Sequence, residues 1–398
     1  MTDTIDTKRR RTRRILIGSG IAVVLSTLLS ATVIAPWVDR QRDPQVPKSA
    51  ELQETLDSLV EEGFPGALAA VTSPTGKVTD YTAGVAELGS DTAPPSDGYV
   101  RIGSNTKMFT AVIILQLVDD GLVELDEPVA SYLPGLLEGY DIDGTTITVR
   151  QLLQHTSGLP NYTGPIVGEL DTTRYQYMSP RDLVDIAFTM PVSFAPGEKW
   201  EYSNTNYILA GLIAEKVTGR PLVNQITERI IEPLQLTETS FPEPGDTTMP
   251  EPHAVGYYSA PGEKAEDFTT LDPSWAWAAG QMIATPSDLN RFMIGLLDGK
   301  LMSDDALDEM QSTIPAPDLW EGAEYGLGLT SYPLSCGGVA WGHGGDIPGY
   351  ETRNAATADG RAATIAVTNL PGSITADEDE AYRIATDVSM SVDVALCE

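Results

Sequence analysis

The sequence predicts an α/β (α+β) fold in which a sheet domain, assembled from both ends of the chain, carries an inserted helical domain. Strand-like runs occur at residues 66–87 and return over 323–370, whereas short helical patterns and loops fill the middle, from about Leu122 to Met249. The length of 398 residues suits one large domain or two interlocked ones. We therefore expect a sheet domain formed by residues 44–105 plus 265–398 and a mainly helical domain formed by residues 106–264.

The first 43 residues differ from the rest. They hold eight basic and four acidic side chains, although the whole chain has a formal charge of −32. Ile15–Val38 has no charged residue and is long enough to cross a bilayer, with a basic flank that predicts an N-terminus inside. We expect a cytoplasmic tail, one retained membrane span and a tether. The alternatives are a cleaved leader, although Pro36 follows the small residues "VIA", and a weak twin-arginine signal in "TRRILI".

Every version of this N-terminal prediction places the bulk of the chain outside the cytoplasm. The two cysteines fit that location, because Cys336 and Cys397 are too far apart for a CxxC motif and are expected to form a disulfide in an oxidising compartment. The strongly acidic remainder of the chain repels polyanions, so no nucleic-acid partner is expected.

Local patterns predict the elements in chain order. Leucines at helical spacing predict a helix over 51–63, and Ser73–Gly76 breaks the run 66–87 into a hairpin. "MFTAVIILQLVDDGLVEL" predicts a buried helix that stops near Gly121, and Thr285 and Pro286 begin another as N-cap and first helical residue. Other helical patterns cover 149–159, 179–190, 206–219, 221–234 and about 376–392, and strands are expected at 323–332, 338–345, 349–358 and 361–370.

Ser104 and Lys107, in "RIGSNTKMFTA", lie three positions apart where a helix is expected to begin. On a helix both side chains project from one face. A desolvated lysine can accept the proton of the serine, and a helix N-terminus favours negative charge that develops nearby. The alternative is a capping serine beside an unrelated lysine.

Two later stretches suit the same chemistry. Tyr202 and Asn204, in "WEYSNTNY", offer a proton shuttle and a ligand for a substrate amide, with an Asn-capped turn as the alternative. His343, Gly344 and Gly345, in "VAWGHGGDIPGY", join a histidine to glycines where the backbone can approach a substrate, with a bend and a structural histidine as the alternative. Their joint occurrence in this order favours a site.

The ordered motifs SxxK, YxN and HxG resemble those of the serine hydrolases of the class C β-lactamase superfamily, and above all those of the secreted, penicillin-sensitive D-alanyl-D-alanine carboxypeptidases. Similar text includes "LQLVDDGLVELDEPVASYLPGL", "ITVRQLLQHTSGL", "YSNTNYILAGLIAEKVTG", "YGLGL" and the cysteine of "LSCGG", from about Leu52 to the end. The resemblance implies a β-lactamase/DD-peptidase-like fold with an antiparallel sheet flanked by helices. It also implies an acyl-enzyme mechanism that uses no cofactor or metal.

The resemblance implies a role for each matching residue. Ser104 is expected to be the acylated nucleophile, with Lys107 as its hydrogen-bonded partner. Tyr202 is expected to be the general acid and base, and His343 to support its proton transfer. The expected substrate contacts and oxyanion donors are Asn204, Trp275 of the cleft wall, Thr330, Gly344 and Gly345, with the backbone N–H groups of Ser104 and Asp346 forming the oxyanion hole.

Two departures from the carboxypeptidases concern the substrate. Thr330 stands where they carry an arginine for the terminal carboxylate of the peptide, and Asp346 stands where the third motif commonly carries a hydroxyl. The expected substrates are D-alanyl peptides, β-lactams, or small esters or amides, the last of these suiting an esterase or a D-amino-acid amidase.

Other classes fit less well. His155, His253 and His343 have no zinc-protease spacing, no GxSxG motif occurs, and "QHTSGL" predicts a structural role for His155. A β-lactam-binding sensor with little turnover is the alternative from another class, although only fourteen residues precede the apolar segment. We expect a monomer.

Overall fold

The computed structural model describes residues 48–137, 142–260, 263–320 and 322–398. Residues Pro47–Glu398 form one compact unit. The predicted tail, membrane span and tether fall outside the described residues, so membrane anchoring stays a prediction. Within the described residues, no helix combines the length and the apolar character needed to span a membrane.

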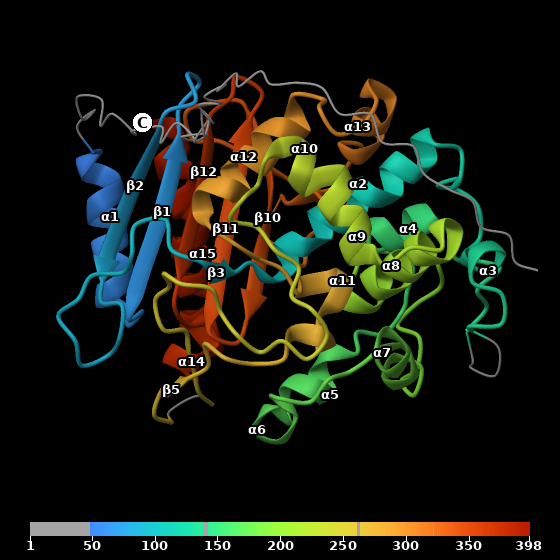
Figure 1. Ribbon diagram of the computed structural model, residues 1–398, viewed down its shortest axis with the longest axis horizontal. Coiled ribbons are helices and arrows are strands. Elements are labelled where there is room, and N and C mark those ends of the chain that lie inside the picture. Colours follow the sequence, from blue (N-terminus) through green and yellow to red (C-terminus); the bar gives the residue numbers. More distant parts are fainter. Residues whose placement is uncertain (1–47, 138–141, 261–262, 321) are drawn as a thin grey trace, which may run out of the picture. The chain divides into compact units, whose positions relative to one another are not determined.

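A central antiparallel sheet organises this unit (Figure 1). Its eight strands are β1 (Gly66–Thr72), β2 (Val78–Gly84), β7 (Ile314–Pro315), β8 (Glu324–Tyr325), β9 (Thr330–Pro333), β10 (Val339–Ile347), β11 (Tyr350–Thr357) and β12 (Ala362–Val367). They lie in the order β2-β1-β12-β11-β10-β9-β8-β7, so the N-terminal hairpin joins the C-terminal strands through β1 and β12. Two short ladders pair β3 (Val100–Arg101) with β6 (Ile283–Ala284) and β4 (Tyr257–Tyr258) with β5 (Glu266–Asp267).

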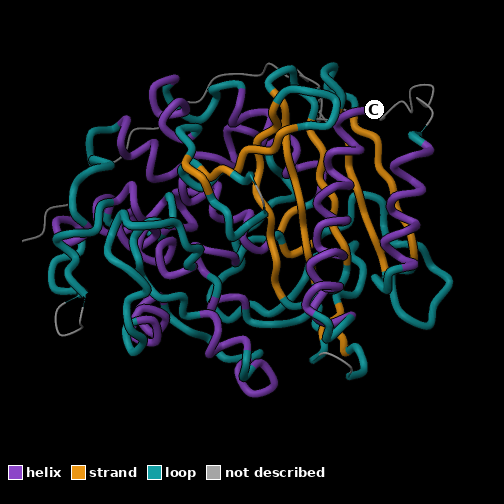
Figure 2. The backbone as a smooth tube through the Cα atoms, turned by 180° about the vertical axis from the view of Figure 1, so that it is seen from behind, coloured by secondary structure: helices purple, strands orange, loops and turns teal. Residues whose placement is uncertain are grey.

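Helices cover both faces of the sheet. Side chains alternate between the faces of a strand, so Ala67 and Ala69 of β1 pack with α1 (Ala50–Glu61) and α15 (Glu378–Cys397), whereas Leu68 joins the opposite core, to which α12 (Pro286–Leu297) contributes. Figure 2, which views the protein from behind, shows α1 and α15 running along the strands on this face of the sheet. The predicted fold class, an antiparallel sheet flanked by helices, is confirmed. The proposed division at 105–106 and 264–265 stays a prediction.

The helices of the middle of the chain pack beside the sheet. They are α2 (Thr106–Asp119), α3 (Val129–Tyr132), α4 (Val149–Leu153), α5 (Thr163–Val167), α6 (Leu170–Thr173), α7 (Pro180–Ala187), α8 (Asn204–Thr218), α9 (Leu222–Ile226), a π-helical turn (Thr227–Ile231) and α10 (Glu232–Leu234). Later in the chain follow α11 (Trp277–Gly280), α13 (Asp304–Met310) and α14 (Pro371–Ile374). Because α2 packs against α8 and α11, its residues 106–117 are all buried, as its continuous apolar run predicted.

Several local predictions are confirmed, and three need correction. The helical pattern over 149–159 forms a helix only as far as Leu153, because His155 has a φ of +58°. Thr285 caps α12 by accepting the N–H of Asp288. The run 323–332, however, is not one strand: a turn separates β8 from β9, with Gly328 at a φ of +79°. The closing helix extends to Cys397, and the Cys336–Cys397 disulfide joins its end to the β9–β10 connection.

Candidate active site

Ser104 lies in a single 3₁₀ turn, Gly103–Asn105, directly before α2. Strand β10 runs against this turn, and two glycines permit the close approach. A Cβ on Gly345 would lie 2.0 Å from the Ile102 carbonyl oxygen. Gly103 has a φ of +49°, and a Cβ there would lie 2.8 Å from the backbone nitrogen of Asp346, so neither position has room for a side chain. The predicted oxyanion donors, the N–H groups of Ser104 and Asp346, therefore belong to two segments in direct contact.

Lys107 is fully buried, and its ammonium nitrogen has three oxygen neighbours. Nζ lies 2.9 Å from Ser104 Oγ, 2.6 Å from Asn204 Oδ1 and 2.8 Å from the carbonyl oxygen of Ala279. Burial lowers the pKa of Lys107 well below 10.5, against a smaller raising effect of Asp346. A neutral amine has two N–H bonds and one lone pair. The two N–H groups can donate to Asn204 Oδ1 and the Ala279 carbonyl oxygen, which only accept hydrogen bonds, and the lone pair can then accept the hydroxyl of Ser104. The geometry thus suits a lysine that accepts the proton of Ser104.

Tyr202 and Asn204 occupy the segment that leads into α8. The Asn204 amide nitrogen lies 3.3 Å from Asn161 Oδ1 and 3.4 Å from Thr163 Oγ1, which directs its oxygen at Lys107. The ring centroid of Tyr202 lies 4.8 Å from the nitrogen of Lys107. Burial raises the pKa of the Tyr202 phenol, while a hydrogen bond with the Ser104 side chain lowers it. Tyr202 is therefore held in its protonated form beside the serine and the lysine.

His343 lies in β10 with both ring nitrogens engaged. Nδ1 donates to the carbonyl oxygen of Gly344, so Nε2 is the acceptor and receives the hydroxyl of Tyr325 over 2.9 Å. Burial lowers the pKa of His343 to about 3. The rings of His343 and Tyr202 lie near each other, with centroids 6.3 Å apart. The role predicted for His343 in the proton transfer of Tyr202 stays a prediction, and Tyr325 is the partner that the sequence did not reveal.

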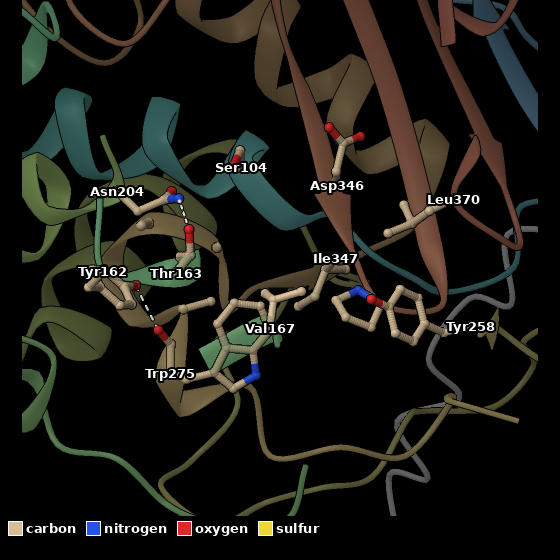
Figure 3. A pocket seen from close by; sticks show the side chains of 14 residues that line it. Ser104, Tyr162, Thr163, Val167, Asn204, Tyr258, Trp275, Asp346, Ile347 and Leu370 are labelled. Carbon is tan, nitrogen blue, oxygen red and sulfur yellow. Dashed lines mark hydrogen bonds between the residues drawn. The ribbon is translucent and has the colours of Figure 1, made fainter. Parts of the chain in front are cut away.

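A cavity of about 210 Å³ opens beside Ser104 (Figure 3). Its lining residues are Ser104, Tyr162, Thr163, Val167, Asn204, Tyr258, Trp275, Ala276, Ala279, Gly280, Asp346, Ile347, Pro348 and Leu370. Four predicted site residues thus share one cavity: Ser104, Asn204, Trp275 and Asp346. Thr330, 2% exposed in β9, and Gly344 and Gly345 do not line it, so their contacts with a substrate stay predictions.

Asp346 is the one acidic residue of this lining, and its side chain is 58% exposed. In Figure 3 its carboxylate points away from Val167 and Trp275. Arg353, on β11, bonds Asp346 over 2.7 Å and the buried carboxylate of Glu351 over 2.6 Å. Burial raises the pKa of Glu351, against the lowering effect of Arg353. Because Arg353 already faces two carboxylates, it is not free to receive a third from a substrate.

The family model described as Beta-lactamase matches residues 52–388. The chain belongs to this β-lactamase family. Among solved structures it is similar to a D-stereospecific amidohydrolase from Streptomyces sp., with 38% identity, a TM-score of 0.76, and coverage of 85% of this chain and 98% of that one. It is also similar to the D-amino acid amidase from Ochrobactrum anthropi SV3, with 29% identity, a TM-score of 0.73, and coverage of 86% and 98%.

Curated relatives of the same family are longer than the matched region. Protein flp of Staphylococcus aureus is 33% identical over 205 residues, which cover 50% of this chain and 39% of that protein. The chain spans 61% of a Bacillus subtilis relative named as a penicillin-binding protein, PbpX, at 29% identity. These β-lactamase-family relatives support the predicted superfamily of serine hydrolases.

Within the β-lactamase-family site, sequence patterns missed the residues that act through others. Asn161 orients Asn204, and Arg353 pairs with Asp346, yet neither belongs to the three motifs. Tyr325 lies in the stretch "YGLGL", which resembles the carboxypeptidase sequences and could have indicated that Tyr325 belongs to the site. Among the described residues, no group of three or more His, Cys, Asp or Glu side chains is arranged to hold a metal ion.

Proposed function

We propose that this chain is a serine hydrolase that forms an acyl-enzyme on Ser104 and cleaves amides or esters of D-amino acids whose leaving group carries no carboxylate. The observation that carries the proposal is the charge of the cavity. Within the described residues its lining has no Arg, Lys or His, and its acidic residue is Asp346. A terminal carboxylate placed there would meet a like charge without a free cation.

The remaining lining supports an apolar acyl group. Val167, Trp275, Ile347 and Leu370 contribute apolar walls, and about 210 Å³ is room for a side chain of moderate size. The names of the two amidase-type structural neighbours supply the D configuration. D-alanyl-D-alanine carboxypeptidase activity, the leading expectation from the sequence, is therefore the second candidate. The sequence motifs favour this activity, whereas the charge of the cavity disfavours it.

The proposed reaction uses Lys107 as the base. Ser104 Oγ–H passes its proton to the neutral Lys107 nitrogen while Oγ bonds to the carbonyl carbon. The carbonyl oxygen takes up the electron pair and is stabilised by the N–H groups of Ser104 and Asp346. Collapse breaks the bond to the leaving nitrogen or oxygen, which receives the hydroxyl proton of Tyr202 as Tyr202 regains one from Lys107. Water then attacks the carbonyl carbon of the acyl-enzyme by the same steps, and Ser104 Oγ leaves and regains its proton.

A substrate comparison on the full-length protein tests this proposal. D-phenylalaninamide, L-phenylalaninamide and a peptide ending in D-Ala-D-Ala would be assayed with the wild type and Ser104→Ala. We expect faster hydrolysis of the D-amide than of either other substrate, and its loss in Ser104→Ala. Ser58→Ala, at an exposed serine of α1, is the matched control. Preferential release of D-alanine from the peptide would replace the proposal with the carboxypeptidase assignment.

A fluorescent penicillin separates the remaining alternatives. Rapid labelling of Ser104 followed by loss of label would indicate β-lactamase turnover. Labelling that persists, together with no hydrolysis of any substrate, would indicate a β-lactam-binding sensor and contradict an enzymatic role.

We also propose that the protein acts outside the cytoplasm, anchored by residues 15–38. The Cys336–Cys397 disulfide and the basic flank before the apolar segment support this location. Fractionation of cells expressing the full chain tests it: the protein should sediment with membranes and resist an alkaline wash. A protein found only in the cytosolic fraction would contradict it.

A further inference from the structure

His155 binds the backbone on both sides of Tyr202. It follows α4 and is fully buried. Its carbonyl oxygen accepts the N–H of Glu201 over 3.0 Å, and its ring nitrogen Nδ1 accepts the N–H of Ser203 over 3.2 Å. Two hydrogen bonds to one residue therefore hold the backbone N–H groups of Glu201 and Ser203, the residues before and after Tyr202.

The imidazole also packs against the phenol ring itself. The ring centroids of His155 and Tyr202 are 4.3 Å apart at an interplanar angle of 34°. Behind them, Tyr325 lies 5.1 Å from His155 and also donates to His343. The plane of the Tyr202 ring is thus restrained by a neighbour whose own position is fixed by hydrogen bonds.

The surrounding donors determine the protonation of His155. Nδ1 faces the N–H of Ser203 and the amide nitrogen of Asn206 at 3.0 Å, and the Asn206 oxygen accepts the hydroxyl of Ser157 over 2.5 Å. Nδ1 is consequently the acceptor and Nε2 carries the proton, with no hydrogen-bond partner for Nε2 among the described residues. Burial lowers the pKa of His155 well below 6.5.

The backbone of His155 has a φ of +58°, a conformation that is uncommon for residues other than glycine, although Asn, Asp and His adopt it more often than the rest. Residues held in such conformations cluster at functional sites when the surrounding structure maintains them. Here the conformation presents both the carbonyl oxygen and Nδ1 of one residue to the segment 201–203. A purely space-filling residue would require neither acceptor.

We propose that His155 is a positioning residue for acyl transfer, which sets the backbone and the ring plane of Tyr202 through its carbonyl oxygen, its Nδ1 and its ring face. This inference rests on the proposed function, because it assigns Tyr202 a part in proton transfer at Ser104. His155 touches neither the cavity nor the serine; it acts through Tyr202. The sequence pattern "QHTSGL" therefore belongs to the site.

Two substitutions separate the acceptor from the rest of the residue. His155→Asn keeps an acceptor on Cγ and tolerates a positive φ, whereas His155→Leu removes the acceptor. The measured rate is divided by the concentration of Ser104 sites that react with the fluorescent penicillin. Loss of folded protein is therefore not counted as loss of catalysis. We expect kcat of His155→Leu to fall about 100-fold with KM nearly unchanged, since displacement of a reacting group by about 1 Å has this effect, and His155→Asn to recover most of it.

His253→Leu is the matched control, because His253 is a half-buried histidine that bonds a backbone oxygen, that of Pro250, and does not line the cavity. Its kcat should be unchanged. If His155→Leu folds and keeps the wild-type kcat per site, the inference is overturned. If His155→Leu does not fold, Asn206→Ala provides the test, because it removes one of the two donors to Nδ1 of His155. The kcat per site of Asn206→Ala should be lower than that of the wild type, and an unchanged kcat overturns the inference.

These outcomes are distinguishable from failure of the proposed function. A wild type that hydrolyses no amide or ester through Ser104 contradicts the proposed function itself. An active wild type with an unchanged His155→Leu contradicts only the role of His155.

Discussion

Replacing Lys107 with methionine should change how stability depends on pH. In the folded protein the pKa of Lys107 lies well below 10.5 because the amine is buried. In the unfolded chain the same amine stays protonated up to about 10.5. Between these two values the unfolded state binds one more proton than the folded state, so the free energy of unfolding of the wild type rises with pH. Lys107→Met lacks this contribution.

The size of the effect follows from one proton. Each pH unit within that window contributes about 1.4 kcal/mol. If Lys107 is neutral in the folded protein at pH 8, as its proposed role as a base requires, the unfolding free energy of wild type minus variant should increase by about 2.7 kcal/mol from pH 8 to pH 10. The variant also leaves Asn204 Oδ1 and the Ala279 carbonyl oxygen without their donor. That loss costs about 1–3 kcal/mol per group but is the same at every pH, so it shifts the difference without changing its slope.

Urea unfolding of the two proteins at pH 8, 9 and 10 measures this difference, and the other titrating groups cancel in it. Lys216→Met, at an exposed lysine in α8, is the matched control and should show no added slope. A difference between wild type and Lys107→Met that stays constant across this range would mean that Lys107 is charged in the folded protein. The proposal that it accepts the proton of Ser104 would then fail.

Three further substitutions test the site and the fold. Asp346→Thr removes the like charge at the cavity and should raise kcat/KM for a carboxylate-terminated peptide relative to the D-amide by about tenfold, measured by competing the two substrates; an unchanged ratio would contradict the charge argument. Tyr325→Phe removes the donor to His343 Nε2, so it should lower kcat about tenfold and the free energy of unfolding by about 1–3 kcal/mol, whereas full activity would show that this hydrogen bond is dispensable. Joint replacement of Cys336 and Cys397 by serine should lower the free energy of unfolding by about 4 kcal/mol in urea titrations, and an unchanged midpoint would refute the stabilising role of the disulfide.

The sequence predicted what depends on local spacing. The interval between Ser104 and Lys107 placed both on one helical face, and the structure brings their side chains to 2.9 Å. The Thr285 cap and the buried character of α2 were equally local. Arg353 and Tyr325 could not be found in this way, because their relevance arises from strand pairing: β11 lies beside β10, which places Arg353 near Asp346.

Thr330 shows how a resemblance between sequences can leave the role of a residue open. The resemblance predicts that Thr330 stands where the carboxypeptidases carry a carboxylate-binding arginine, and in the structure Thr330 is buried and paired with Gly342 in the sheet. A short buried side chain cannot replace a long cation that reaches into a cavity. Threonine in place of arginine therefore removes a positive charge that a substrate could bind. This effect on the substrate could be judged only once the residues that line the cavity were known.

The site keeps four buried titratable side chains uncharged inside a strongly acidic protein. Burial lowers the pKa values of Lys107, His155 and His343 and raises that of Tyr202, so desolvation favours the neutral form of all four. In the proposed reaction, attack by Ser104 creates a cation on Lys107 and an anion on the substrate oxygen where neither charge existed before. Backbone N–H groups fixed in advance at the oxygen stabilise that new charge without reorganising, and they stabilise it more strongly in a site that excludes water. Under the proposed function, the exposed Asp346, rather than a buried group, is therefore the residue expected to discriminate between substrates by charge.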